Sequence, residues 1–433
     1  MKLKKYKLGD IAKIEISGVD KKTIEGETPV RLCNFVDVYY NWAITKEKAK
    51  SFMVASAKQT EIDKCSIGKG MVAITKDSET RDDIGVATYI ADDFEDVLLG
   101  YHCALITPNP AIVDGKYLNA FMHTRYIQKY FENNASGSGQ RYTLSNDTIS
   151  NIPVLLPSIE EQHIIGKLLA DLDRKIELNK QINDNLEAMA KQLYDYWFVQ
   201  FDFPNEEGKP YKSSDGAMVW NEKLKREIPE GWNVANVFDE LSVQYGFPFS
   251  TELFTEEPTS IPVVRIRDIL ENSVSAYSEE EVDEKYKLQK QDLLVGMDGN
   301  FHMNYWNDNV SYLNQRSVRL RAKSKSTVSI MQAKYDIAPY IKAKELRAKG
   351  STVGHLSDKD LKELFVLVCP NTDFRNKFDS ILAEIIENRC EMIELTKQRD
   401  ELLPLLMNGQ ATINYHLSVF VSPYYIIYRD LYK

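Results

Sequence analysis

The chain has 433 residues, a length typical of two or three domains, and 43% of them are hydrophobic, which is enough to build cores. It has no signal-peptide-like start and no run of about 18 apolar residues that could span a membrane, so we expect a cytoplasmic protein. The five cysteines are scattered without a CxxC pair, which predicts free thiols and no zinc site. The net charge of −10 argues at first sight against binding to nucleic acid.

The first 157 residues are expected to form a mixed α/β module. Short β-rich segments alternate with polar turns, and residues 117–131 have helical spacing. The segment NNASGSGQRYTLS at 133–145 is too rich in glycine and small polar residues for regular structure. The expected strands of this module cover residues 29–38, 70–77, 84–91 and 150–157.

The next segment, residues 159–198, contains no proline, and its apolar residues recur at steps of three and four. This spacing predicts a single helix of roughly 57 Å that packs along another helix. The positions expected on its packed face are Leu172, Ile176, Asn179, Ile182, Leu186, Met189, Leu193 and Trp197. The aromatic residues Trp197, Phe198 and Phe201 have two interpretations: they cover the end of this helix, or they dock a partner subunit.

The pattern then repeats, which predicts a tandem duplication. A second module is followed by a second long helix at 374–407, and the two helices align at a constant offset that pairs Asn179 with Asn388. A buried asparagine on the packed face would fix the register of the pair, whereas the alternative is that both asparagines are exposed. Pro404 is expected to kink or end the second helix. Further packed positions of this helix are Ile385, Leu395 and Leu402.

We therefore predict two globular α/β modules separated by two long antiparallel coiled-coil helices, with pseudo-twofold symmetry and an overall α+β class. A twofold arrangement suits DNA, whose half-sites repeat about every 34–36 Å. The expected boundaries are 1–157 for the first module, 158–200 for the first long helix, 201–228 for a connector, 229–370 for the second module, 371–409 for the second long helix and 410–433 for a tail of unclear role.

No nucleotide-binding, zinc-protease or serine-hydrolase motif is present, so we expect a non-catalytic chain without a bound metal. Residues 314–349 carry a local excess of positive charge, which indicates either a basic DNA-facing surface or a solvated lysine-rich helix. Loops at matching places in both modules offer the side chains that read bases and hold phosphates, although ordinary surface turns are the alternative for each. The candidate DNA-binding residues are Lys76, Arg81, Ser136, Ser138, Gln140, Arg141, Tyr142, Arg265, Arg267, Asp298, Asn300, Arg316, Lys349, Ser351, Thr352 and His355.

The central run from LPSIEEQ to QLYDYWF at 156–198 closely resembles type I restriction–modification specificity subunits, and IPEGW at 228–232 and DLLVGMDGNF at 292–301 are similar to the same family. The resemblance implies that each module is a target recognition domain that reads one half of a bipartite DNA site. It also implies that the helices set the gap and dock two adenine methyltransferase subunits carrying S-adenosylmethionine. Restriction and translocase subunits using ATP and Mg²⁺ would join them. The second copy lacks the EEQ of the first, and the tail does not resemble the family.

Two rival functions follow from the residues. A self-contained nuclease–methyltransferase is disfavoured because the nucleotide and methyl-donor motifs are missing. An architectural coiled-coil scaffold that binds proteins at both ends is the stronger alternative, because the acidic net charge disfavours tight autonomous binding to DNA.

Overall fold

The chain forms two compact units in the computed structural model, which describes residues 2–139, 141–258, 260–348, 354–414 and 425–428. Unit 1 comprises Met1–Ile176 and Glu394–Lys433, and unit 2 comprises Glu177–Ile393. Two helices of 36 residues each, α8 (Ile159–Tyr194) and α13 (Thr372–Met407), contribute one segment to each unit. Each unit is therefore a globular module together with a segment of both long helices.

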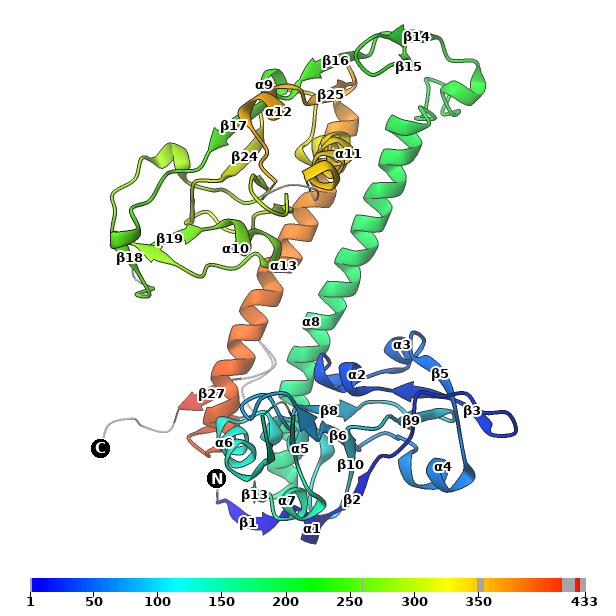
Figure 1. The fold of residues 1–433 in the computed structure, drawn as a ribbon, viewed down its shortest axis with the longest axis vertical. Helices are drawn as coiled ribbons and strands as arrows, with labels where there is room; N and C mark the ends of the chain where they lie inside the picture. The colour runs from blue at the N-terminus through cyan, green and yellow to red at the C-terminus, as the bar shows by residue number, and fades with distance from the viewer. Residues whose placement is uncertain (1, 140, 259, 349–353, 415–424, 429–433) are drawn as a thin grey trace. The chain divides into compact units, whose positions relative to one another are not determined.

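The module of unit 1 is built on a five-stranded sheet in the order β2-β10-β6-β8-β4 (Figure 1). Side chains alternate across this sheet: Val72 and Ile74 of β6 enter one core cluster, and Ala73 enters another on the opposite face. The first cluster is completed by the helices α5 and α6 and by the ends of the long helices. The elements are β1 (Lys4–Lys7), α1 (Leu8–Ile11), β2 (Ala12–Ile16), β3 (Thr28–Cys33), α2 (Phe35–Tyr39), β4 (Ala43–Ile44), α3 (Lys46–Ala49), β5 (Met53–Ala57), α4 (Gln59–Cys65), β6 (Val72–Thr75), β7 (Asp77–Ser78), β8 (Ala87–Ile90), β9 (Val97–Leu99), β10 (Cys103–Pro108), α5 (Gly115–Met122), α6 (Arg125–Asn134), β11 (Ser136–Ser138), β12 (Arg141–Thr143), α7 (Asn146–Ser150) and β13 (Pro153–Leu156).

The module of unit 2 repeats this arrangement. Its sheet β17-β24-β21-β22 matches β2-β10-β6-β8, and the pair β16-β25 matches β1-β13. The predicted tandem duplication is confirmed. The elements are β14 (Met218–Asn221), β15 (Arg226–Pro229), β16 (Asn233–Asn236), α9 (Val237–Glu240), β17 (Leu241–Tyr245), β18 (Phe254–Thr255), β19 (Ile261–Val264), α10 (Ile266–Glu271), β20 (Tyr277–Ser278), β21 (Leu293–Gly296), β22 (Met303–Tyr305), β23 (Tyr312–Leu313), β24 (Ser317–Ala322), α11 (Ile330–Ala348), α12 (Asp358–Lys362) and β25 (Phe365–Val368).

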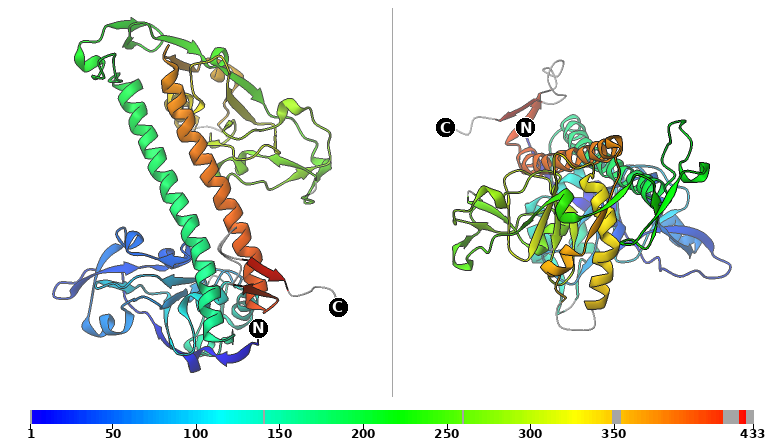
Figure 2. Two further views of the ribbon diagram at one scale, coloured as in Figure 1. Left: turned by 180° about the vertical axis from the view of Figure 1, so that it is seen from behind. Right: turned by 90° about the horizontal axis from the view of Figure 1, so that it is seen from above.

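The long helices pack antiparallel within each unit, and Figure 2 shows them side by side. In unit 2, Asn388 Nδ2 donates to Asn183 Oδ1 at 2.9 Å, and Asn183 Nδ2 donates to the carbonyl of Ile385 at 3.1 Å. In unit 1, Arg399 forms an ion pair with Asp173 at 3.7 Å. The burial of Asn179 and Asn388, which are 6% and 9% exposed, excludes the alternative that both asparagines are exposed.

The packed positions predicted for the helices divide between the two units. Leu172 and Leu402 pack on the core of unit 1, whereas Leu186 and Leu193 pack on that of unit 2. Ile385 and Leu395 are buried, and Ile176 is half-buried. The prediction is wrong for Ile182 and Met189, which are 43% and 41% exposed, because the neighbouring Asn183 and Ala190 take the buried positions. Gly166 lets α8 approach α5, because a Cβ at this position would lie 2.7 Å from the backbone nitrogen of Tyr117.

The expectation that Pro404 kinks or ends the second helix is corrected in one respect, because α13 continues through Pro404 to Met407. The carbonyl of Pro404 still accepts a hydrogen bond from the amide of Asn408 at 3.0 Å. Only the final turn follows the proline, so a single missing amide is tolerated there. In the tail, β26 (Ala411–Asn414) and β27 (Tyr425–Tyr428) pair antiparallel.

Candidate nucleic-acid interface

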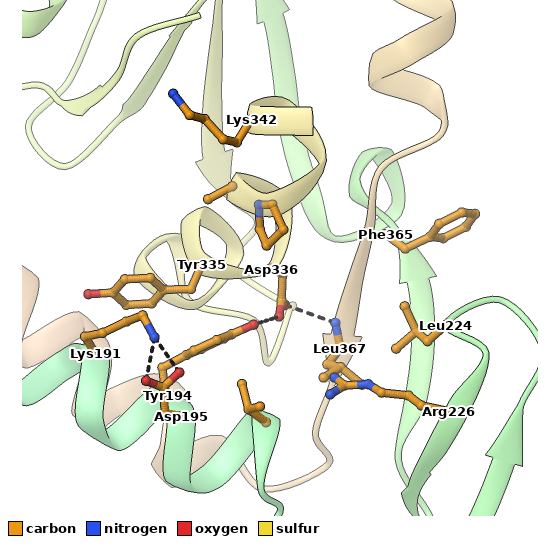
Figure 3. Close-up of a pocket in the computed structure, with 13 residues that line it drawn as sticks. Lys191, Tyr194, Asp195, Leu224, Arg226, Tyr335, Asp336, Lys342, Phe365 and Leu367 are labelled. Atoms are coloured by element: carbon orange, nitrogen blue, oxygen red, sulfur yellow. Dashed lines mark hydrogen bonds and ion pairs between the residues drawn. The ribbon is translucent and has the colours of Figure 1, made fainter. Parts of the chain in front are cut away.

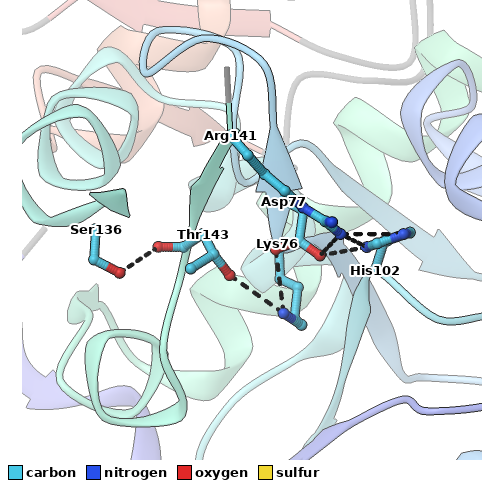
Figure 4. Close-up of polar contacts among 6 residues, drawn as sticks. All are labelled: Lys76, Asp77, His102, Ser136, Arg141 and Thr143. Carbon is cyan, nitrogen blue, oxygen red and sulfur yellow. Dashed lines mark hydrogen bonds and ion pairs between the residues drawn. The ribbon is translucent and has the colours of Figure 1, made fainter. Parts of the chain in front are cut away.

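A small three-stranded sheet, β11-β12-β7, brings residues 77–78 and the predicted loop at 133–145 together around Asp77 (Figure 4). The expectation that 133–145 has no regular structure is wrong, because β11 and β12 both lie within it. The carboxylate of Asp77 is bonded to Nδ1 of His102 and lies 3.2 Å from Nζ of Lys76. The guanidinium of Arg141 approaches the same carboxylate at 3.6 Å and His102 Nδ1 at 2.9 Å. The Lys76 ammonium also donates to Thr143 Oγ1 at 3.2 Å.

The same backbone frame recurs in unit 2 around Asp298. The amide following the central strand donates to the carbonyl of the turn residue at 2.8 Å in both units, from Lys76 to His102 and from Met297 to Arg316. Asp77 pairs with Thr143 across the small sheet, as Asp298 does with His355 in an isolated bridge. The turn residues His102 and Arg316 are both left-handed, with φ of 70° and 68°. A strained conformation repeated at matching positions is typical of functional sites.

The side chains of the second frame carry the same charge pattern with different residues. Arg316 Nη1 donates to Asp298 Oδ2 at 2.9 Å, and His355 Nδ1 lies 2.5 Å from Asp298 Oδ1. We call the sets Asp77, His102, Arg141 and Asp298, Arg316, His355 the two aspartate frames. Each frame holds one carboxylate between two cationic or protonatable side chains.

The electrostatics of the frames leave the cations available to a ligand. Burial alone would raise the pKa of Asp77, but hydrogen bonds from Thr143 and His102 and the charge of Lys76 outweigh it and lower this pKa. Asp77 is therefore ionised at neutral pH and orients its neighbours. The Arg141 and Arg316 side chains are 65% and 62% exposed, so most of their N–H groups face solvent.

Each frame opens onto a hollow. In unit 1 a hollow of about 580 Å³ is bounded by His102 and Arg141 and by α2, which contributes Phe35, Val36 and Tyr40. In unit 2 a hollow of about 520 Å³ is bounded by Arg316 and by polar residues. Its lining consists of Arg265, Ile266, Arg267, Asn300, His302, Asn314, Gln315 and Arg316.

The structure brings together some of the predicted DNA-binding residues and separates others. Lys76 and Arg141 meet in the first frame, and Asp298, Arg316 and His355 form the second. Arg81 lies over the ring of Tyr142, 5.0 Å from its centroid, beside the first frame. Ser138 is in β11, and Gln140, Lys349, Ser351 and Thr352 lie outside the described residues.

Two predicted residues make intramolecular contacts instead. Arg265 donates to the carbonyl of Ser275 at 2.8 Å and contacts Asp268, so its guanidinium is held within the module. Ser136 Oγ donates to the carbonyl of Thr143 at 3.2 Å within the small sheet. By contrast, Arg267 and Asn300 are exposed at the hollow of unit 2.

The sequence analysis missed Asp77 and His102. Asp77 ends the segment GMVAITKD, which aligns with the segment that contains the candidate Asp298. His102 directly precedes β10, as Arg316 directly precedes the equivalent strand β24. Extending the internal alignment to these two positions would have found both.

The charge excess at 314–349 does not form one basic face. Arg321 is paired with Asp292 at 2.6 Å, and Asp292 is 1% exposed. Burial lowers the pKa of Lys334, whose ammonium lies 4.4 Å from the ring centroid of Tyr305. Neither a basic DNA-facing surface nor a solvated lysine-rich helix describes the whole run, because β24 and α11 place several of its cationic side chains in the interior.

The aromatic residues at the end of α8 are explained by packing. Trp197 stacks on Phe374 with ring centroids 4.6 Å apart, and Phe198 and Phe201 are 0% and 2% exposed. They cover the start of α13, so Phe198 and Phe201 cannot contact a partner in this conformation. The π-helical turn Asp195–Val199 carries Trp197 and Phe198 into this cluster.

Beside that turn lies a further hollow of about 590 Å³ within unit 2 (Figure 3). The Tyr194 hydroxyl donates to Asp336 at 2.8 Å, and the amide of Leu367 donates to the same carboxylate at 3.1 Å. Burial raises the pKa of Asp336 to about 6 despite these hydrogen bonds. Lys191 is paired with Asp195 at 2.5 Å, and Lys342, which also lines the hollow, is paired with Glu345 at 2.9 Å.

Within the described residues, three or more histidine, cysteine or acidic side chains nowhere gather in a way that could hold a metal ion. None of the described helices is long and apolar enough to cross a membrane.

The fold is therefore a tandem duplication of one α/β module. Each copy carries an aspartate frame and is joined to the paired long helices. The family described as the type I restriction modification DNA specificity domain matches residues 2–188 and 229–404. The chain belongs to this family. The predicted identity, and with it a role in DNA target recognition, is confirmed.

Individual relatives agree with this assignment. The type I restriction enzyme MjaIX specificity subunit of Methanocaldococcus jannaschii is 26% identical over 321 residues, which are 71% of this chain and 71% of that protein. The HindI specificity subunit of Haemophilus influenzae is 33% identical over 126 residues, or 29% and 28% of the two chains. The crystal structure of a type I restriction–modification S subunit from M. genitalium shares the fold, with a TM-score of 0.57, 15% identity and coverage of 94% and 96%.

Proposed function

We propose that this chain is the non-catalytic recognition subunit of a type I restriction–modification complex. Each module reads one half of a bipartite site in double-stranded DNA, and the paired helices set the gap between the halves. The duplicated aspartate frame is the observation that carries this proposal, because one geometry occurs in both modules with different side chains. Matching frames give matching modes of docking, and different side chains give different half-sites.

The chemistry of the frames suits DNA. Arginine donates bidentately to guanine O6 and N7 or to a phosphate, and histidine and aspartate can add donors and acceptors at base edges. In the free protein the carboxylate orients each arginine and reduces the freedom that the guanidinium would lose on binding. The first frame places Arg141 between Asp77 and His102, and the second places Arg316 against Asp298.

Partner subunits would supply the covalent chemistry. Two methyltransferase subunits carrying S-adenosylmethionine would dock on the long helices and adjoining segments, and restriction or translocase subunits would use ATP and Mg²⁺. The exposed faces of α8 and α13, and not the buried Phe198 and Phe201, are the surfaces open to such docking. Leu178, Ile182 and Met189 on α8 are 46%, 43% and 41% exposed and offer apolar contacts.

The test uses one substitution in each frame. Arg141→Ala and Arg316→Ala would be produced with the methyltransferase subunit in cells, and methylated adenines would be mapped across the genome. Each variant is expected to relax or abolish recognition of a different half-site. Arg125→Ala at the start of α6, an arginine that is 71% exposed and lies outside both frames and both long helices, is the control and should leave the map unchanged.

Two outcomes would contradict the proposal. If both frame variants altered the same half-site, or weakened both halves equally, the modules would not be separate readers. If both variants methylated the wild-type site at the wild-type rate, the frames would not contact DNA. A scaffold that binds only proteins would be indicated if the second outcome were joined by loss of complex assembly.

A further inference from the structure

The short helices α2 and α10 hold equivalent places in the two modules. Each directly follows a strand of its module's second sheet, β3 of β5-β3-β9 or β19 of β18-β20-β19-β23, and packs against the central strand, β6 or β21. Each also begins with the same hydrogen bond: the backbone amide of Asn34 donates to Asp37 Oδ2 at 2.8 Å, and that of Arg265 donates to Asp268 Oδ2 at 2.9 Å. The shared geometry aligns the second helical residues, Val36 and Arg267, with each other.

Both residues face the hollow of their own aspartate frame. Val36 lines the hollow with His102 and Arg141, and Arg267 lines the hollow with Arg316. Val36 is 55% exposed, and Arg267 is exposed as well. Within the part of the chain that the structure describes, the Arg267 guanidinium makes no hydrogen bond or ion pair, in contrast to its neighbour Arg265.

The linings of the two hollows differ. Beside Val36, Tyr40 is 77% exposed, and the exposed acidic side chains of Glu79 and Asp83 line the same hollow. Beside Arg267 the exposed side chains include the amides of Asn300 and Gln315. The first hollow therefore offers apolar contact at Val36 and Tyr40, whereas the second offers hydrogen-bond donors that no described group of the protein uses.

We propose that this helical position selects a base in each half-site: Arg267 specifies guanine in the half read by the second module, and Val36 favours thymine in the half read by the first. Arginine pairs bidentately with guanine O6 and N7 in the major groove, whereas an apolar side chain contacts the thymine methyl group. The inference rests on the proposed function, because it requires that each module reads DNA. Beyond the proposed function, the inference names one base in each half-site and the residue that recognises it.

The test exchanges the two residues. Complexes of the methyltransferase subunit with wild-type chain, Arg267→Val or Val36→Arg would methylate a DNA pool in which every half-site position is randomised, and the products would be sequenced. Arg267→Val should lower the preference for guanine at one position of one half-site by about 5- to 150-fold and leave the other half unchanged. Val36→Arg should shift one position of the other half from thymine towards guanine.

Two further variants separate base reading from charge. Arg267→Lys keeps the charge but loses the bidentate fork, so it should retain overall methylation while losing most of the guanine preference. Arg125→Val is the matched control away from both hollows and from the long helices, and thermal unfolding checks that each variant is folded. A uniform loss of methylation in Arg267→Val without a change of base preference would identify a phosphate contact and overturn the inference.

The inference can fail while the proposed function stands. If Arg316→Ala changes a half-site and Arg267→Val changes nothing, the second module reads DNA but not through this helical position. If neither affects any half-site, the proposed function fails together with the inference.

Discussion

The buried asparagine pair between the long helices gives a stability prediction that can be worked through from its geometry. Among the described residues, Asn388 Nδ2 is the only donor to Asn183 Oδ1, at 2.9 Å, and Asn388→Ala removes it. Asn183 is only 6% exposed. Leaving a buried acceptor unsatisfied costs about 1–3 kcal/mol. That cost lowers the folding equilibrium constant by about 5- to 150-fold. Replacing both residues by leucine removes donor and acceptor together, so Asn183→Leu with Asn388→Leu should be nearly neutral or stabilising.

Urea unfolding of the full chain at constant pH measures these changes. Asn185→Ala is the matched control, because Asn185 lies on the same helix two residues from Asn183 but is exposed. It should change the free energy of unfolding by less than about 0.5 kcal/mol. If Asn388→Ala behaved like Asn185→Ala, with an unchanged dependence on urea, the pair would contribute nothing and the reasoning would be refuted. A double-mutant cycle of Asn183→Ala and Asn388→Ala should give a coupling of about 0.5–3 kcal/mol.

Three further outcomes are expected. Insertion of one heptad within 175–185 should lengthen the gap of the methylated site and leave both half-sites intact; altered half-sites with the original gap would show that the helices do not set the spacing. Gly166→Ala should lower the melting temperature, because its Cβ would lie 2.7 Å from the nitrogen of Tyr117, whereas Gly18→Ala meets nothing within 4 Å and should be nearly neutral. The raised pKa of Asp336, about 6, means that its protonated form is preferred in the folded state, so its contribution to stability is complete below about pH 4 and is lost as the pH rises through about 6. Asp336→Asn should weaken the pH dependence of the urea midpoint between these pH values. An unchanged pH dependence would contradict the raised pKa of Asp336.

The sequence by itself determined the long helices and the duplication. Helical periodicity is a local property, so apolar steps of three and four, with no proline before the last turn, were sufficient to place both helices within a few residues of their ends. The constant offset between Asn179 and Asn388 then identified the repeat without any knowledge of contacts. The resemblance of the central run to a known family was also visible in the sequence alone.

Tertiary structure alone decided which charged residues are available. Arg265 and Arg267 are two residues apart, and the sequence does not distinguish them. In the structure Arg265 donates hydrogen bonds to Asp268 and Ser275, whereas Arg267 faces a hollow. The partner that neutralises Arg321 is Asp292, 29 residues away in sequence. Ion pairing depends on distances that chain folding sets, and no local pattern encodes them.

The same reason explains the first aspartate frame. His102 lies 25 residues from Asp77 and 39 from Arg141, and only the pairing of β12 with β7 and the turn before β10 bring the three together. Packing likewise explains the aromatic residues after α8, because Trp197 contacts Phe374 and Phe201 contacts Trp232. Both partners come from distant segments of the chain. Periodicity in the sequence therefore predicted the helices and the repeat. Long-range contacts determined which charged side chains stay exposed and available to bind DNA.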